Sequence, residues 1–134
     1  MNKLLILIIF LILGLNANQI TLEDDKEKVH NLNKIIYFSR GAKKTNSNQN
    51  IRLKKHAEYM IKTKDIKLLL EAYTDNVGDR EVNNWMALDY AKACKETLVK
   101  YGVDASRISI TTFGASKSTR NEIRDRKVEF IYYY

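Results

Sequence analysis

The sequence predicts an α/β domain, more narrowly an α+β two-layer sandwich in which helices pack on one face of a mixed sheet. Four β-rich apolar runs and two helical patterns follow one another in the order β-α-β-α-β-β. Strands separated by helices favour parallel or mixed pairing, because each helix carries the chain back across the sheet. The 134 residues, 45% hydrophobic and 29% charged, suit one globular domain with a closed core.

The N-terminus is typical of a secretion signal. Lys3 gives a positive start, residues 4–15 are almost wholly apolar, and residues 16–19 turn polar, so we expect cleavage after Ala17. A membrane anchor is the alternative, but a hydrocarbon core of about 30 Å needs about 20 apolar residues. No cysteine lies near the cleavage point, so a lipid attached to a cysteine is not expected. We therefore predict an exported protein of the periplasm or cell envelope.

Three segments follow from this pattern: a signal peptide over 1–17, a polar lead-in over 18–33 and a folded domain over 34–134. In the domain, the apolar run 35–38 predicts a first strand, which ends before Gly41. Residues 45–48 then supply capping side chains for a helix. The apolar positions of that helix recur at helical spacing: Leu53, Ala57, Met60 and Ile61.

A second strand over 66–74 alternates so that Ile66, Leu68, Leu70 and Ala72 share one face, which predicts a central strand. A longer helix follows from about Asp79, a plausible N-cap, to Tyr101, and Gly102 suits its C-terminal end. Its expected core face is made of these residues: Val82, Met86, Ala87, Ala91, Cys94 and Leu98.

Alternation over 107–113 and over 127–132 predicts the last two strands. Val128, Phe130 and Tyr132 share one face of the final strand. We expect this C-terminal end of the chain to form a sheet edge.

Composition argues against catalysis, a bound metal and a cofactor. His30 and His56 are the only histidines, and we expect a lone histidine on a helix to lie at the surface or at the core boundary. Cys94 falls on an apolar helix face, where cysteine is usually a small hydrophobe. The net charge of +7 could suit nucleic acid, but an exported protein meets lipid headgroups and wall polymers instead. We predict a non-enzymatic protein without a nucleic-acid partner.

The segment that joins the central strand to the long helix, residues 74–83, is the informative one. Asp75 ends the strand, Gly78 supplies a turn, and the helix N-terminus points free N–H groups into the same crevice. An ammonium group could bind the Asp75 carboxylate while a carboxylate binds the helix N-terminus, so the crevice could hold an amino acid at both ends. The alternative is that Asp75 only caps the turn.

These residues resemble the OmpA-like, peptidoglycan-associating domains, and the resemblance covers roughly 35–130. The matching motifs are T-D-x-x-G-x-x-x-x-N at 74–83, M-A-x-x-Y-A at 86–91 against L-S-x-x-R-A, L-x-x-x-G-V at 98–103, R-I at 107–108, Gly114, and D-R-K-V-E at 125–129 against N-R-R-V-E.

The resemblance implies a module that binds peptidoglycan non-covalently by gripping the diamino acid of the stem peptide. Asp75 would receive its ammonium and Thr74 would order the loop. Asn83 would help to shape the pocket, and Arg126 would border it.

One residue departs from the family: the arginine that takes the free carboxylate of diaminopimelate is Tyr90 here. A neutral phenol cannot make the bidentate, charged bond of a guanidinium. Tyr90 could be plain packing, with binding lost, or Arg80 or Arg126 could reach the carboxylate. In the third reading the wall contains ornithine or lysine, which lack the second carboxylate, and Tyr90 adds a cation–π contact.

A different class of function stays open beside these readings. The chain could keep the fold as a structural or interaction protein that has lost wall binding and recruits an envelope membrane protein.

Overall fold

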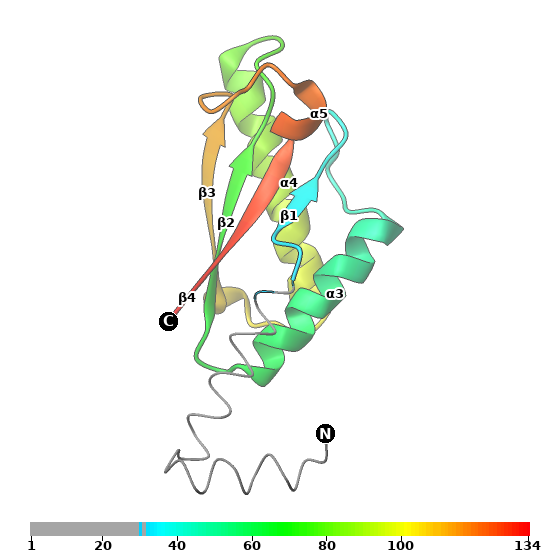
Figure 1. Cartoon of the computed structure of the whole chain (residues 1–134), viewed down its shortest axis with the longest axis vertical. Coiled ribbons are helices and arrows are strands. Elements are labelled where there is room, and N and C mark those ends of the chain that lie inside the picture. The colour runs from blue at the N-terminus through cyan, green and yellow to red at the C-terminus, as the bar shows by residue number, and fades with distance from the viewer. Residues whose placement is uncertain (1–29, 31) are drawn as a thin grey trace, which may run out of the picture. The chain divides into compact units, whose positions relative to one another are not determined.

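Two long helices, one short helix and a four-stranded mixed sheet form the folded part of the computed structural model, which describes residue 30 and residues 32–134 (Figure 1). The predicted signal peptide and nearly all of the lead-in lie outside the described residues. Residues Asn33–Tyr134 form one compact unit. The elements are β1 (Ile35–Tyr37), α3 (Ser47–Lys62), β2 (Lys67–Tyr73), α4 (Arg80–Lys100), a 3-10 turn (Ala105–Arg107), β3 (Ile108–Gly114), α5 (Glu122–Asp125) and β4 (Lys127–Tyr133). The predicted order β-α-β-α-β-β and the two-layer architecture are confirmed.

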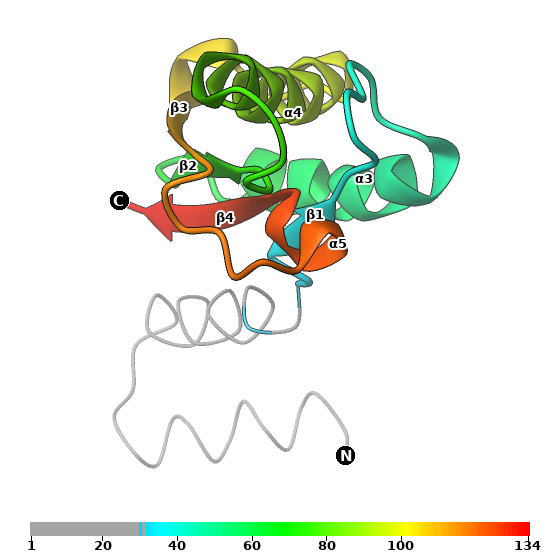
Figure 2. The same cartoon turned by 90° about the horizontal axis from the view of Figure 1, so that it is seen from above.

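The strand order is β1-β4-β2-β3, so the predicted central strand β2 is indeed internal. It pairs in parallel with β3 and antiparallel with β4, and β1 pairs antiparallel with β4. Its predicted inner face is fully buried, at Leu68, Leu70 and Ala72. Figure 2 shows α3 and α4 on one side of the sheet.

The expectation that the C-terminal strand forms an edge is wrong. β4 lies between β1 and β2, with Val128 opposite both Ile36 and Ala72. Its two pairings close the core, because Val128 and Phe130 are buried on the helix side. Ile131, Tyr133 and Tyr134 are exposed, although Tyr133 still pairs with Lys67 of β2.

Capping fixes where both long helices begin. The side chain of Asn46 accepts from the backbone N–H of Gln49, and the Gln49 side chain accepts from Asn46 N–H, a capping box that starts α3. Asp79 caps α4, as predicted. Past the end of α4, Gly102 has φ 104°, a left-handed value that glycine adopts without strain.

The buried face of α4 is rotated slightly from the predicted one. Val82 is 52% exposed, while Asn83 and Tyr90 are buried beside the expected Ala87, Ala91, Cys94 and Leu98. In the first turn of α4 the buried residue is thus the polar Asn83 and the exposed one the apolar Val82. On α3, the predicted core residue Ile61 is likewise exposed. None of the described helices is both long enough and apolar enough to cross a membrane.

His56 is a core residue, contrary to its expected place at the surface or boundary. It is buried against Phe130, with ring centroids 4.5 Å apart. Its Nε2 lies 2.9 Å from the Asn33 carbonyl and its Nδ1 lies 2.6 Å from the Tyr132 hydroxyl. A carbonyl only accepts, so Nε2 carries the proton and Nδ1 accepts from Tyr132. The neutral ring therefore satisfies both contacts, and its burial lowers the pKa of His56 to about 4.

This pKa predicts loss of stability in mild acid. The unfolded chain takes up a proton on this histidine near pH 6.5 and the folded protein only near pH 4, so the free energy of unfolding falls as the pH drops through this window. The loss attributable to this group is about 3 kcal/mol. Urea unfolding at pH 7 and pH 4.5 measures it.

The control is the exposed His30. His56→Gln should flatten the pH dependence between 6.5 and 4, whereas His30→Gln should leave it as in the wild type. A slope that survives His56→Gln would show that another group causes it.

Candidate functional site

The sheet register brings the predicted site residues to one end of the domain. Tyr73 lies opposite Lys127, so Thr74 and Asp75 leave β2 beside Arg126 at the head of β4. The Thr74 N–H donates to the Gly114 carbonyl at 2.9 Å, which extends the pairing of β2 with β3 by one residue and fixes the start of the loop. On α4, Tyr90 contacts Phe38 and Gly41, and Asn83 lines a pocket between α4 and β3.

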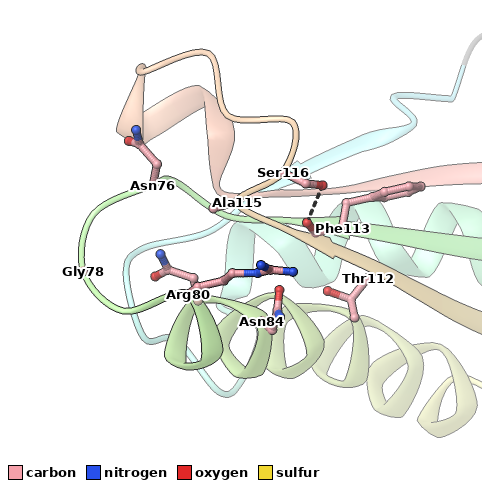
Figure 3. Close-up of a pocket in the computed structure, with 9 residues that line it drawn as sticks. Asn76, Gly78, Arg80, Asn84, Thr112, Phe113, Ala115 and Ser116 are labelled. Atoms are coloured by element: carbon pink, nitrogen blue, oxygen red, sulfur yellow. Dashed lines mark hydrogen bonds between the residues drawn. The ribbon is translucent and has the colours of Figure 1, made fainter.

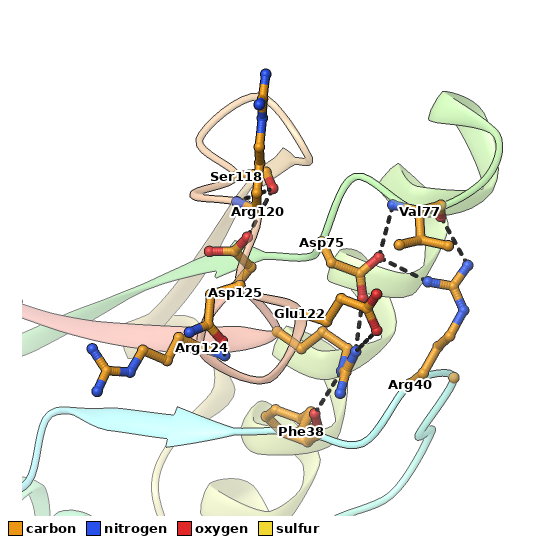
Figure 4. Close-up of polar contacts among 12 residues, drawn as sticks. Phe38, Arg40, Asp75, Val77, Ser118, Arg120, Glu122, Arg124 and Asp125 are labelled. Carbon is orange, nitrogen blue, oxygen red and sulfur yellow. Dashed lines mark hydrogen bonds and ion pairs between the residues drawn. The ribbon is translucent and has the colours of Figure 1, made fainter.

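Asp75 is completely buried and both of its carboxylate oxygens are bonded (Figure 4). Oδ1 accepts from Arg40 Nη1 at 2.8 Å and from the Val77 N–H at 3.0 Å. Oδ2 accepts from Arg126 Nη1 at 2.9 Å. One carboxylate thus lies between two guanidinium groups, and we call these three side chains the Asp75 cluster.

The cluster keeps Asp75 ionised. Burial by itself would raise the pKa of Asp75, but the hydrogen bonds from Arg126 and Val77 and the charge of Arg40 outweigh it, and the pKa lies below its usual value. Asp75 also makes the turn bond to Val77 that the simpler interpretation of the sequence expected. Capping the turn and holding two cations are therefore done by the same carboxylate.

Arg126 is held as a structural counter-ion. Its Nε donates to the Phe38 carbonyl at 3.2 Å, and its own carbonyl accepts from the Phe38 N–H at 2.9 Å. Its side chain is 12% exposed, and Glu122 lies 3.8 Å away on α5. Arg126 thus lies beside Asp75, and its role at the border of a ligand pocket stays a prediction.

Arg40 is the cluster residue that the sequence analysis missed. It lies in the loop between β1 and α3, where its Nη2 donates to the Val77 carbonyl at 2.9 Å as Nη1 binds Asp75. Its side chain is 40% exposed. The signal that could have found it is weak, a lone arginine just after the first predicted strand, next to Gly41, whose φ of 71° turns the loop.

Tyr90 is buried where the resemblance would place an arginine. Its ring stacks on Phe38 with centroids 4.8 Å apart, and its hydroxyl accepts from the Gly41 N–H at 3.3 Å. Burial raises the pKa of Tyr90, so the phenol stays neutral. Tyr90 thus packs in the core, as one of the three interpretations of this residue expected, and its hydroxyl also binds the loop that carries Arg40.

A pocket of about 670 Å³ lies along the same loop, between the start of α4 and the end of β3 (Figure 3). Its lining residues are Asn76, Gly78, Arg80, Asn83, Asn84, Thr112, Phe113, Ala115 and Ser116. The side chain of Asn83 is buried, and its Oδ1 has no hydrogen-bond partner among the described residues. Arg80 is one of the lining residues of this pocket and is not part of the Asp75 cluster.

The helix N-terminus is less open than expected. Oδ1 of Asp79 accepts from the N–H groups of Glu81 at 2.8 Å and Val82 at 3.1 Å. These two donors of the first turn are already satisfied, so they are not free to bind a ligand carboxylate as the sequence suggested.

No group of three or more potential metal ligands occurs among His, Cys, Asp and Glu in the described part of the chain. Cys94 is a free thiol in the core, and burial raises its pKa. A thiol in such surroundings is a poor nucleophile.

The cluster predicts a stability role for Asp75 that the sequence did not. Asp75→Asn would leave two arginines without their buried anion, and we expect the free energy of unfolding to fall by about 2–4 kcal/mol. Asp65→Asn, at an exposed aspartate between α3 and β2, is the matched control and should change it little. Urea unfolding at neutral pH compares the two. Equal stability of both variants would refute a structural role for the ion pairs.

Comparison with known proteins finds solved structures with a similar fold, and a family model that matches the sequence. The structure resembles the peptidoglycan-associated lipoprotein of Burkholderia pseudomallei (TM-score 0.72, 19% identity, covering 79% of this chain and 99% of that one). It also resembles the OmpA-like domain of FopA1 from Francisella tularensis (0.65, 13%, 73% and 70%) and the periplasmic domain of Helicobacter pylori MotB (0.60, 17%, 72% and 69%).

A curated relative, outer membrane protein 40 of Porphyromonas gingivalis, is 34% identical over 89 residues, which make up 66% of this chain. The match spans only 23% of that protein's length. The model of the OmpA family matches residues 37–128, the span that contains every residue of the Asp75 cluster. The chain belongs to the OmpA family.

Proposed function

We propose that this chain is a non-catalytic module of the cell envelope that binds the stem peptide of peptidoglycan non-covalently, with Asp75 as the principal ligand residue. The observation that carries the proposal is the buried Asp75 carboxylate at the carboxyl end of the internal strand β2, where it lies in the family motif and binds Arg126. The fold likeness to a peptidoglycan-associated lipoprotein supports it.

The proposed location is the periplasm, reached by export with the predicted signal peptide. Peptidoglycan is the polymer that such a protein meets there. Catalysis is not part of the proposal, because the one carboxylate in the Asp75 cluster is already held on both oxygens by the two guanidinium groups.

We propose further that the stem peptide is of the ornithine or lysine type. The neutral Tyr90 replaces the cation that would pair with a second carboxylate, and Arg126 is already bonded to Asp75. A diamino acid with only a side-chain ammonium needs no such partner. Diaminopimelate would bring its second carboxylate next to a buried phenol, at the cost of an unpaired charge.

A second candidate, the interaction protein that has lost wall binding, is favoured by one observation: both oxygens of Asp75 already have protein partners. Such a protein would adhere to envelope components through its net positive charge. Sacculus pull-down at low and at about 1 M salt separates the two functions. Adhesion through scattered lysines should vanish at high salt, whereas a ligand in a pocket should persist.

The ligand class is tested by isothermal titration with muropeptides that differ only in the diamino acid. The ornithine and lysine forms should bind at least about tenfold more tightly than the diaminopimelate form, because only the last brings a carboxylate without a partner. Asp75→Asn should remove the binding, measured at a temperature where it is folded, and Asp65→Asn should keep it. Equal or absent binding of all three muropeptides would contradict the proposal.

A further inference from the structure

Two acceptors in the Asp75 cluster and its loop bind the same cation. They are Oδ1 of Asp75 and the carbonyl oxygen of Val77, and Arg40 binds both, at 2.8 and 2.9 Å (Figure 4). A carboxylate oxygen beside a carbonyl oxygen also suits a primary ammonium, which offers three donors and accepts nothing. Arg40, which binds both acceptors in the structure, thus has the same positive charge as the ammonium of the proposed ligand.

The two arginines of the cluster differ in how firmly they are held. Arg126 is 12% exposed, and its backbone and side chain are both tied to Phe38. Arg40 is 40% exposed and comes from a loop, and its bonds to Asp75 and Val77 engage only two of its five N–H donors. Arg126 is therefore the fixed counter-ion of Asp75, and Arg40 is the one that can leave.

We propose that Arg40 is an exchangeable internal competitor, which the side-chain ammonium of the stem peptide replaces at Asp75 Oδ1 and the Val77 carbonyl. This inference rests on the proposed function. The exchange conserves charge, because one monovalent cation leaves as another arrives and Arg126 keeps its bond to Oδ2. It also explains how a carboxylate with no exposed surface can take a ligand: the Arg40 side chain covers it and moves away.

Specificity follows from the same geometry. Only a ligand group that restores the positive charge can displace Arg40 without leaving Asp75 short of a partner, so a neutral or acetylated side chain cannot bind there. An ammonium is a compact point charge with three donors, so one nitrogen can serve both acceptors, whereas the planar guanidinium of Arg40 uses two nitrogens. Competition with Arg40 thus makes the site selective for free primary ammonium groups.

The test is Arg40→Ala, titrated with an ornithine-type stem peptide. The apparent affinity of a site that is partly occupied by its own side chain is reduced by the fraction that is closed. Removal of Arg40 should therefore tighten binding, by about threefold to tenfold. The control is Arg124→Ala, which removes the same charge from an exposed residue on α5. In Figure 4 the side chain of Arg124 points away from Asp75. Arg124→Ala should tighten binding much less.

Two further measurements sharpen the result. A stem peptide acetylated on the side-chain nitrogen should bind neither the wild type nor Arg40→Ala. In the wild type, the NMR signal of Arg40 Nε should shift on addition of the ornithine peptide, while that of Arg126 Nε should stay in place because Phe38 holds it.

Weaker or unchanged binding of Arg40→Ala would overturn the inference, since Arg40 would then contact the ligand or lie outside its path. The proposed function would still stand if Asp75→Asn lost the binding that the wild type shows. Absence of binding in the wild type and in Arg40→Ala would refute both the inference and the proposed function. Binding that appears only in Arg40→Ala would support the inference strongly.

Discussion

The pairing of Asp75 with Arg40 and Arg126 is the interaction on which the functional end of the domain depends. It joins three segments that are far apart in the sequence: the loop after β1, the end of β2 and the head of β4. The strand order makes this meeting unavoidable, because β4 lies between β1 and β2. Tyr37 and Tyr73 both lie opposite Lys127, so β1 and β2 end and β4 begins at one level of the sheet.

The same carboxylate has to serve stability and binding, and these two tasks conflict. A buried anion is stable only with its cations in place, while a ligand can reach it only if one of them leaves. The unequal anchoring of the two arginines resolves the conflict, since Arg126 keeps Asp75 paired at all times. Functional sites often carry such a locally unfavourable arrangement, which the surrounding structure holds in place.

The sequence predicted the fold well because local patterns control it. Alternation marked β2 and β4, and the capping side chains of Asn46 and Asp79 marked the helix starts. The prediction from sequence failed where the position of a strand depends on its pairing partners. β4 was expected at an edge, because no local signal shows that a C-terminal strand is inserted between two earlier ones. The burial of His56 depended on Tyr132 and the Asn33 carbonyl, which are distant in sequence.

The same division applies to the site. Asp75 and Arg126 lie in sequence motifs and could be named in advance, and the structure brings them within 2.9 Å. Arg40 carries no motif, and only the turn at Gly41 and the register of β1 bring it to Asp75. The predicted free N–H groups of α4 were a plausible inference from helix geometry, but the side chain of Asp79 consumes two of them.

Tyr90 stands where the family has an arginine, and it also contacts the loop that carries Arg40. The phenol accepts from the Gly41 N–H and stacks on Phe38, so it contacts the loop on both sides of Arg40. An arginine at position 90 would place a third guanidinium near one carboxylate, with Arg40 and Arg126 already there. A neutral residue at 90 and a cation at 40 are therefore two parts of one arrangement: Tyr90 removes the surplus charge and fixes the loop from which Arg40 reaches Asp75.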